Sequence, residues 1–420
     1  MERKYKVKNS TLLGGDDKFV FADSSGLFAK NTHDLWNTIT DTSRLDTARP
    51  DGGAPQIGGA YQKVFENATT GIGNRNLFVD SGDSLVNLKV ANNKPVNFNS
   101  LSTTYNDKQK VALLNFMGYS EPEEAKIKDN TALTSTQNKA LKNIGGVLHS
   151  IPQLITKEVA VDATGKFDTS KRKDYIIYGS MDGALHMLDD STGKETFTFV
   201  PKQILDLQPK ALTGSGSAED GSYPYGVDAP WLTYASYTTK STTTGTGAAA
   251  TTVNTYESDQ SFALGGLRMG GSMYYALDVS NFESPKIIYS VGSNYANRLK
   301  KLSTDISGVK NGVSAITSSA AASADQKAYA RMGQTWGKPA LGYVKSGGKR
   351  VMVSFLPGGY DACYENPTFK LGTNYPDDTQ CSNKDVAQGN SIYMVQVGEV
   401  ETKANNEEKV DTSKNNGNLL

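Results

Sequence analysis

Apolar and polar residues alternate most regularly in "DYIIYGSMDGALHMLDDSTGKETFTFVP", residues 174–201. Alternation with period two, in short runs bounded by Gly, Asp and Ser, predicts three strands joined by tight turns. In the second turn Gly193 supplies the positive φ that such hairpins require. Asp189, Gly193 and Phe197 are therefore expected to be architectural residues of a sheet unit.

The same heptamer shape occurs three times, as "LHMLDDS" (185–191), "YYALDVS" (274–280) and "IYMVQVG" (392–398). A further strand follows the first two, and Asp278 takes the place of Asp189 in the second. We predict equivalent strands of successive sheet units, which is the mark of a radial β repeat. Chance similarity among Tyr-, Val- and Leu-rich strands is the alternative.

The predicted fold is mainly β, a modified β-propeller with long loop insertions and a few short helices. The heptamers lie farther apart than the roughly 40–50 residues of a propeller blade, which indicates insertions or weaker blades between them. Insertions are predicted near 238–258, as a mobile low-complexity loop, and near 300–332, partly helical. Neither shows an apolar face, so both should project from the scaffold.

The predicted domains are a lead-in segment at 1–140 and the β-propeller at 141–420, which we expect to be truncated at its C-terminal end. Residues 32–50 and 106–118 carry helical patterns, the second with Asn106 as N-cap and Gly118 beyond its end. Residues 76–79 and 85–90 are expected to form a hairpin.

Lys and Arg number 44, as do Asp and Glu, so long-range attraction to nucleic acid or to an anionic membrane is not indicated. Hydrophobic residues make up 37%, while Gly (41) and Tyr (21) are abundant, which is typical of a β-rich extracellular protein. No apolar run is long enough to cross a bilayer, and the basic start is not followed by the apolar segment of a secretory signal. We expect the chain to be a piece of a longer, exported protein.

The two cysteines, Cys363 and Cys381, flank a polar, turn-rich stretch. In an oxidising compartment they are predicted to form a disulfide, which stabilises by roughly 3 kcal/mol in the chain-entropy model. Two free thiols in a cytosolic protein are the alternative. Aromatic residues in this stretch, Tyr364 and Tyr375, are the predicted binding surface.

Candidate chemistry is sparse, and no catalytic residue is predicted. His149 and His186 are expected to be packed, hydrogen-bonded structural residues, because the histidines show no ligand spacing. "GGLRMGG" (265–271) precedes a strand rather than opening a helix, which favours a close approach of strands over a phosphate loop. The acidic cluster Asp377, Asp378 and Asp385 is a weak candidate calcium site.

The stretch "LDDSTGKETFTF" resembles the blade closure of quinoprotein dehydrogenases. The resemblance implies quinoprotein-like blades, with Phe197 at the position where those enzymes commonly carry a tryptophan that docks one blade on the next. Those enzymes also use a vicinal cysteine pair, whereas Cys363 and Cys381 are not adjacent. A periplasmic enzyme that depends on pyrroloquinoline quinone (PQQ) is therefore the runner-up function.

A run of motifs in fixed order resembles the C-terminal β-propeller of the PilC/PilY family, adhesins and assembly factors at the tip of type IV pili. The motifs that carry it stand at 145–155, 175–201, 265–291 and 333–361, with weaker likeness near 50–65 and 73–79. The family's calcium loop of the form DxDxDxxxD and its RGD tripeptide are absent. Calcium is therefore implied only for the full-length protein, and no cofactor is evident in this chain.

The resemblance implies a type IV pilus biogenesis factor and tip-associated adhesin whose propeller is a non-catalytic scaffold. Its partners would be the pilin or minor pilins and a host-cell surface receptor, with no nucleic acid. Its place would be the pilus tip or the outer membrane surface. An intracellular scaffold of the WD-repeat type is a third hypothesis, which predicts free thiols at Cys363 and Cys381.

Overall fold

A computed structural model describes residues 75–420 with gaps at 82–83, 102–103, 138–144, 163, 214–224, 246–249, 294–319, 321, 378–380 and 404–406. Before residue 75 it describes 6–8 and 11–13, which pair as strands β1 (Lys6–Lys8) and β2 (Thr11–Leu13), and the single residues 36, 60 and 63. The helix predicted at 32–50 and most of the insertion near 300–332 lie outside the described residues. No described helix is long and apolar enough to span a membrane.

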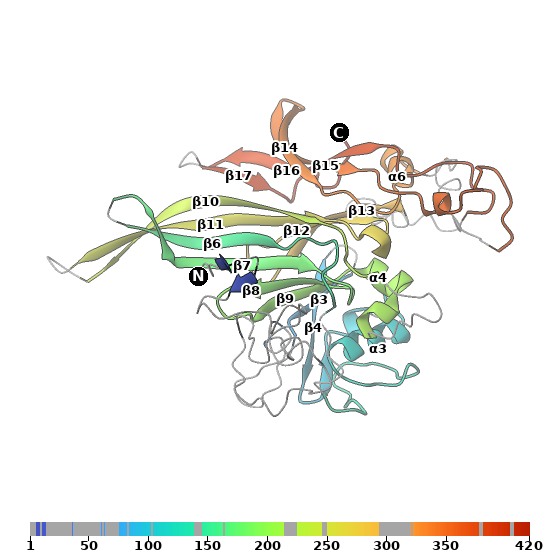
Figure 1. Cartoon of the computed structure of the whole chain (residues 1–420), viewed down its shortest axis with the longest axis horizontal. Helices are drawn as coiled ribbons and strands as arrows, with labels where there is room; N and C mark the ends of the chain where they lie inside the picture. The colour runs from blue at the N-terminus through green and yellow to red at the C-terminus, as the bar shows by residue number, and fades with distance from the viewer. Residues whose placement is uncertain are drawn as a thin grey trace.

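Three antiparallel meanders of four strands follow one another along the chain (Figure 1). The first meander consists of β6 (Gln153–Val161), β7 (Phe167–Gly179), β8 (Leu185–Asp189) and β9 (Glu195–Val200). The second consists of β10 (Trp231–Thr244), β11 (Thr251–Gly265), β12 (Met273–Asp278) and β13 (Lys286–Gly292). The third consists of β14 (Ala340–Ser346), β15 (Lys349–Pro357), β16 (Ile392–Thr402) and β17 (Glu408–Asp411).

The three heptamers of the sequence repeat fall on β8, β12 and β16, which are the third strands of the three meanders. Their equivalence, predicted from the recurring heptamer, is therefore confirmed. The strands predicted to follow the first two heptamers are β9 and β13, the fourth strands. The chain is mainly β, as the sequence predicts.

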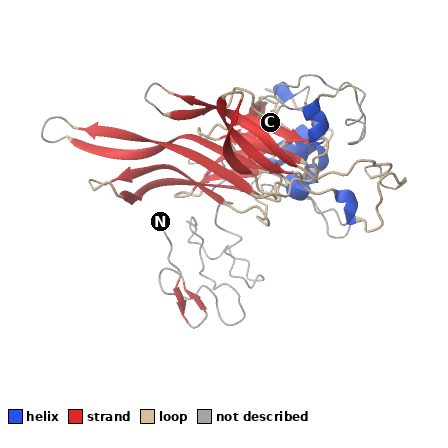
Figure 2. Cartoon of the chain, turned by 90° about the horizontal axis from the view of Figure 1, so that it is seen from above, coloured by secondary structure: helices blue, strands red, loops and turns tan. Residues whose placement is uncertain are grey.

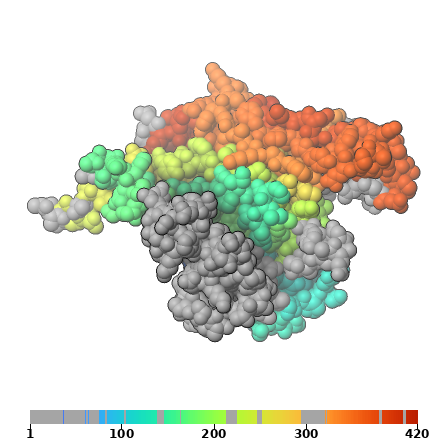
Figure 3. Space-filling view, viewed as in Figure 1, coloured from blue at the N-terminus to red at the C-terminus, as the bar shows by residue number. Residues whose placement is uncertain are grey.

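The closed ring of a propeller is not present in the described part of the chain. Residues Asn254–Glu257 of β11 pair with Val161–Glu158 of β6, so the first two meanders form one continuous sheet rather than separate blades. That sheet has 11 strands, and the third meander is a separate four-stranded sheet. Figure 3 shows the third meander, orange to red, as a continuous upper layer.

The lead-in segment contributes the hairpin of β3 (Leu77–Asp80) and β4 (Leu85–Ala91), followed by β5 (Lys94–Val96). The hairpin is confirmed within one residue of its predicted bounds. Because β3 pairs in parallel with β9, the lead-in joins the sheet of the first meander. The division between 1–140 and 141–420 stays a prediction.

Helices lie at one end of the strands (Figure 2). The predicted helix at 106–118 is α3 (Asp107–Phe116), and the Asn106 side chain accepts a hydrogen bond from Gln109 N, completing a capping box. Beyond it lie α4 (Lys202–Leu207) and α6 (Ala324–Tyr329), the latter within the predicted insertion at 300–332. Short 3₁₀ turns complete the set: η2 (Asn99–Leu101), η4 (Pro209–Thr213), η6 (Arg268–Gly270) and η8 (Ala362–Glu365).

The insertion predicted as a mobile loop near 238–258 is instead mostly paired strand. Thr238–Thr244 of β10 pair with Thr251–Glu257 of β11 in the outer part of a long hairpin. Asn254–Glu257 still pair with β6, and the tip of the hairpin projects beyond the sheet (Figure 1). Threonine has a high strand propensity, and opposed threonine hydroxyls bond across the hairpin, as Thr243 and Thr252 do at 2.9 Å. The segment thus projects only at its tip, and the prediction of a loop is wrong.

Two apolar clusters hold the meanders together. Phe197 is fully buried between the first and second meanders, where Phe199 and Tyr275 also meet with ring centroids 5.4 Å apart. A second cluster joins β12 and β13 to β15, β16 and α6 through buried residues such as Tyr289 and Val395. Each large side chain buried in this way stabilises the fold by about 1.5–3 kcal/mol.

Candidate functional site

The longest connection within a described meander lies between β15 and β16, at residues 358–391, which we call the disulfide loop. The corresponding connections of the first and second meanders run only from 180 to 184 and from 266 to 272. Cys363 and Cys381 are joined, with Cα atoms 5.6 Å apart, so the predicted disulfide is confirmed. The two cysteines and Phe369 form a small buried cluster of their own.

A buried ion pair fixes the base of the disulfide loop. Lys384 Nζ lies 2.6 Å from Asp361 Oδ1, and the two side chains are 7% and 3% exposed. Asp361 also accepts hydrogen bonds from the backbone N–H groups of Cys363 and Gln388. Gln388 Nε2 in turn donates to the carbonyl of Met332, just after α6, at 2.8 Å. The loop is therefore anchored to the scaffold by contacts that the sequence did not reveal.

The two tyrosines predicted as a binding surface have different environments. Tyr364 is 49% exposed, and its ring meets Phe369 edge to face at 5.1 Å. Tyr375 is half-buried; its hydroxyl accepts from Lys370 N and donates to the Thr368 carbonyl. Tyr364 is accessible to a partner, whereas Tyr375 serves mainly to shape the loop. Their role in binding stays a prediction.

The weak calcium candidate cannot be assembled from the described residues. Asp377 and Asp385 are exposed, and Asp378 lies outside the described residues. Among the described residues, no three His, Cys, Asp or Glu side chains lie close enough together to hold a metal ion.

An open groove of about 700 Å³ lies at the base of the disulfide loop. Both ends of the loop contribute to it, together with the segment that leads into β14. The described residues that line it are Trp336, Gly337, Pro357, Gly358, Gly359, Tyr360, Gly389, Asn390, Ser391 and Ile392.

Beside the groove, the segments that lead into the three meanders converge. His149 precedes β6, Asp228 precedes β10, and Trp336 precedes β14. His149 Nδ1 lies 2.7 Å from Asp228 Oδ2, and Arg268 Nη1 donates to the same oxygen at 3.0 Å. The Arg268 guanidinium lies over the Trp336 ring, 4.1 Å from its centroid.

This convergence corrects the interpretation of His149, which is hydrogen-bonded but not packed: its side chain is 49% exposed, whereas the Asp228 carboxylate behind it is buried. Ser150, which follows it, accepts a hydrogen bond from Gly179 N in the interior. Arg268 has a positive φ of 55°, a conformation that costs a non-glycine residue about 1 kcal/mol or more.

The glycines of "GGLRMGG" permit a close approach of backbone, but to the segments before β10 and β14 rather than between strands as predicted. A Cβ on Gly270 would overlap the Gly226 carbonyl, and a Cβ on Gly266 would overlap Thr335. The segment forms η6 and the start of the connection to β12, not the opening of a long helix.

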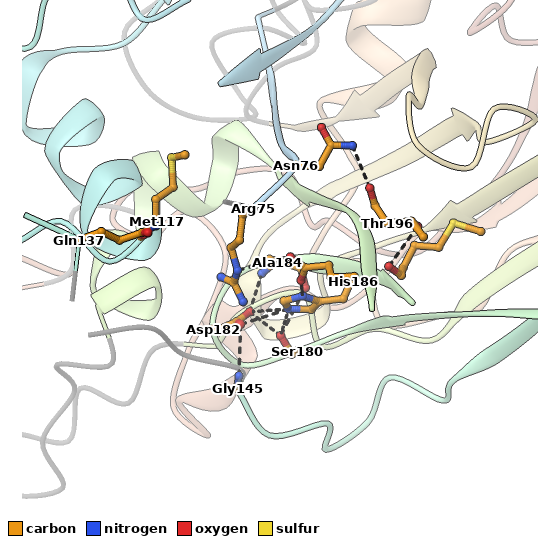
Figure 4. A network of polar contacts seen from close by, with 12 residues as sticks. Arg75, Asn76, Met117, Gln137, Gly145, Ser180, Asp182, Ala184, His186 and Thr196 are labelled. Carbon is orange, nitrogen blue, oxygen red and sulfur yellow. Dashed lines mark hydrogen bonds and ion pairs between the residues drawn. The ribbon is translucent and has the colours of Figure 1, made fainter. Parts of the chain in front are cut away.

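A fully buried charged network surrounds His186 (Figure 4). His186 Nε2 lies 3.1 Å from both carboxylate oxygens of Asp182, and Nδ1 lies 2.8 Å from Glu195 Oε1. Arg75 Nε is 3.4 Å from Glu195 Oε2, and Ser180 donates to Asp182. Two cations facing two carboxylates give a balanced cluster.

Electrostatic interactions in this network favour the charged forms of His186, Asp182 and Glu195. Burial by itself opposes charging of His186, but the Asp182 and Glu195 carboxylates outweigh it and raise the pKa of His186 from 6.5 to about 9. Burial likewise opposes ionisation of both carboxyls, yet His186 holds the pKa of Asp182 below its ordinary value, and Arg75 does the same for Glu195. His186 is thus a packed structural residue, as predicted. Since the network is sealed from solvent, it offers no accessible reactive atom.

Architectural residues predicted from the repeat occupy turns and interfaces. Asp189 Oδ1 accepts hydrogen bonds from the backbone N–H and hydroxyl of Ser191, and Asp278 Oδ1 does the same with Ser280. Gly193 has φ +70°, and the Trp36 ring packs where its Cβ would lie. Trp36 Nε1 also donates to the Asp190 carbonyl at 2.8 Å. An indole therefore does pack on this turn, but it comes from Trp36, far away in the sequence.

Comparisons with known proteins find only distant likeness. No protein-family profile matches the chain, and no curated protein sequence matches it. The crystal structure of the Pseudomonas aeruginosa PilY1 C-terminal domain matches with a TM-score of 0.24 and 16% identity, over 55% of this chain and 31% of that chain. This chain thus spans about a third of that domain's length, and a likeness of this level decides neither fold nor function.

Proposed function

We propose that this chain is a non-catalytic binding and assembly module of a type IV pilus system, exported to the cell surface and acting at the pilus tip. The proposal rests on the ordered run of PilC/PilY-like motifs and on the three meanders, whose third strands carry the recurring heptamer. Pilin or minor pilins and a host-cell surface receptor are the proposed partners. We further propose that its meanders belong to a propeller completed by other parts of the protein.

The observation that carries the proposal is the disulfide loop. A long connection, closed by Cys363–Cys381 and pinned by Asp361–Lys384, stands at the position where the other two meanders have short turns. A rigid loop with an exposed aromatic side chain, Tyr364, is well suited to recognition, because little conformational entropy is lost on binding.

Deletion of the gene in its own bacterium tests this function. Surface pili are counted by electron microscopy, and attachment to host cells is scored, with the deletion complemented by the full gene. Loss of pili or attachment that the gene restores is the expected result. Normal pili and normal attachment would overturn the proposal, and alcohol-dependent reduction of added PQQ by the pure protein would then support the dehydrogenase.

A further inference from the structure

We infer that the groove at the base of the disulfide loop binds an uncharged saccharide. The inference rests on the proposed function, since it names the class of ligand that the binding module would recognise. The walls of the groove combine aromatic rings, an amide, a hydroxyl and backbone exposed at glycines.

Charge is the first discriminating property. None of the described residues that line the groove is charged. Of the neighbouring cations, Arg268 pairs with Asp228, and Lys338 donates to the Gln153 side chain at 3.2 Å. Arg331, whose carbonyl accepts from Gly389 N, is exposed and is not part of the lining. A phosphate, a carboxylate or an ammonium group would find no opposite charge among the lining side chains, so the groove favours a neutral ligand.

The shape of the groove is the second discriminating property. Gly358, Gly359 and Gly389 form part of the lining, so a ligand can lie directly against the backbone. A Cβ on Gly358 would come within 2.5 Å of the Ser391 carbonyl oxygen, so larger residues are excluded there by the fold itself. The volume of about 700 Å³ falls within the range of roughly 300–1,000 Å³ typical of small-ligand sites.

The polar and apolar groups fit a sugar together. A pyranose ring has a face of C–H groups, which packs on aromatic or aliphatic surface, and a rim of hydroxyls that both donate and accept. Trp336, Tyr360 and the 76% exposed Ile392 supply apolar surface. Asn390 and Ser391, both exposed, supply donors and acceptors at the rim. The indole N–H of Trp336 is already used by Gln334 at 3.1 Å, so its orientation is fixed before a ligand arrives.

Isothermal titration calorimetry on the purified full chain tests the inference. The saccharides are maltohexaose, cellohexaose, chitotetraose and lacto-N-neotetraose, and decaproline is the rival ligand for an aromatic groove. At least one saccharide is expected to bind. Asn390→Ala should weaken binding roughly fivefold, as loss of about one hydrogen bond does. Ile392→Asp should weaken it further.

Matched controls are Asn254→Ala on the projecting hairpin and Phe167→Asp, which places a charge at a 57% exposed apolar position on β7. Both should bind as the unmodified protein does. Failure of all four saccharides to bind, binding of decaproline alone, or equal loss in the controls would overturn the inference. The pilus and attachment phenotypes of the gene deletion are scored separately, so the proposed function can stand when this ligand class fails.

Discussion

Asp361 and Lys384 form an ion pair at 2.6 Å beneath the disulfide loop, and both side chains are almost completely buried. The pair joins the two ends of the loop, and Gln388 continues the contact to the segment after α6. A loop held in this way behaves as part of the scaffold rather than as a tether. Its two anchors, ionic and covalent, lead to separate predictions.

Breaking the ion pair on one side should be costly. Lys384→Met leaves a buried carboxylate uncompensated, which typically costs about 3–5 kcal/mol. The double variant Asp361→Asn/Lys384→Met should recover much of this loss, because no charge is then left buried. Thermal and urea unfolding measure the effect, with Arg350→Ala, which breaks the half-exposed pair with Glu408, as the control. A Lys384→Met loss no larger than that of the surface control would contradict the account.

The disulfide should persist in protein made in an oxidising compartment. Thiol titration of the denatured, unreduced chain is expected to find no free thiol, since the only cysteines are Cys363 and Cys381. Cys363→Ser/Cys381→Ser should lower the free energy of unfolding by roughly 3 kcal/mol. Two titratable thiols in protein taken from its native location would favour the intracellular scaffold instead.

The His186 network predicts how stability depends on pH. Because its pKa is raised from 6.5 to about 9 in the folded chain, the His186 proton stabilises the fold fully below pH 6.5, and this contribution is lost as pH rises through 9. Asp182 and Glu195 have lowered pKa values, so their contribution is present above about pH 4.5 and is lost as the medium becomes more acidic.

Urea unfolding at pH 6, 7.5 and 9 measures this slope. Between pH 6 and pH 9 the free energy of unfolding of the unmodified chain should fall by roughly 2 kcal/mol or more, because His186 loses its proton. His186→Asn should be less stable at pH 6 and show a flatter slope to pH 9. A variant slope as steep as that of the unmodified chain would assign the pH dependence to other groups.

Substitutions at Gly193 and Gly165 distinguish the cost of backbone strain from the cost of disturbed packing. Both have positive φ, but only Gly193 faces a ring, that of Trp36, while a Cβ on Gly165 would meet open space. Gly165→Ala should therefore cost about 1 kcal/mol, and Gly193→Ala should cost about 1–3 kcal/mol more. Melting temperature and Trp fluorescence check this. Equal losses would show that Trp36 does not pack against the turn.

The sequence predicted the features that depend on local pattern. Strands β8, β12 and β16 follow from the recurring heptamer, and α3 follows from its N-cap Asn106 and from Gly118 beyond its end. The outer β10–β11 hairpin was missed because its Ser/Thr composition suggested low complexity, although opposed threonines suit a strand pair.

The convergence of His149, Asp228, Arg268 and Trp336 was also beyond the sequence. Asp228 and Arg268 belong to the second meander, whereas His149 and Trp336 come from the first and third, and only the packing of the three meanders brings them together. Trp36 on the Gly193 turn is hidden in the same way. The blade resemblance places a docking aromatic residue at Phe197, whereas the indole that packs on the turn belongs to Trp36, far away in the sequence.

The central claim is that the disulfide loop is the recognition element of a pilus-associated scaffold. Replacing residues 361–388 by a short Gly-Asn-Gly turn tests it most directly, because the backbones of Gly359 and Gly389 are already in contact and the turn can close there. The variant is expressed in the gene-deletion strain, and its folding is checked by cell-surface display. We predict that the intact gene restores pili or host-cell attachment. The loop-replaced variant, although displayed at the cell surface, should restore neither. Full restoration by that variant would contradict the account.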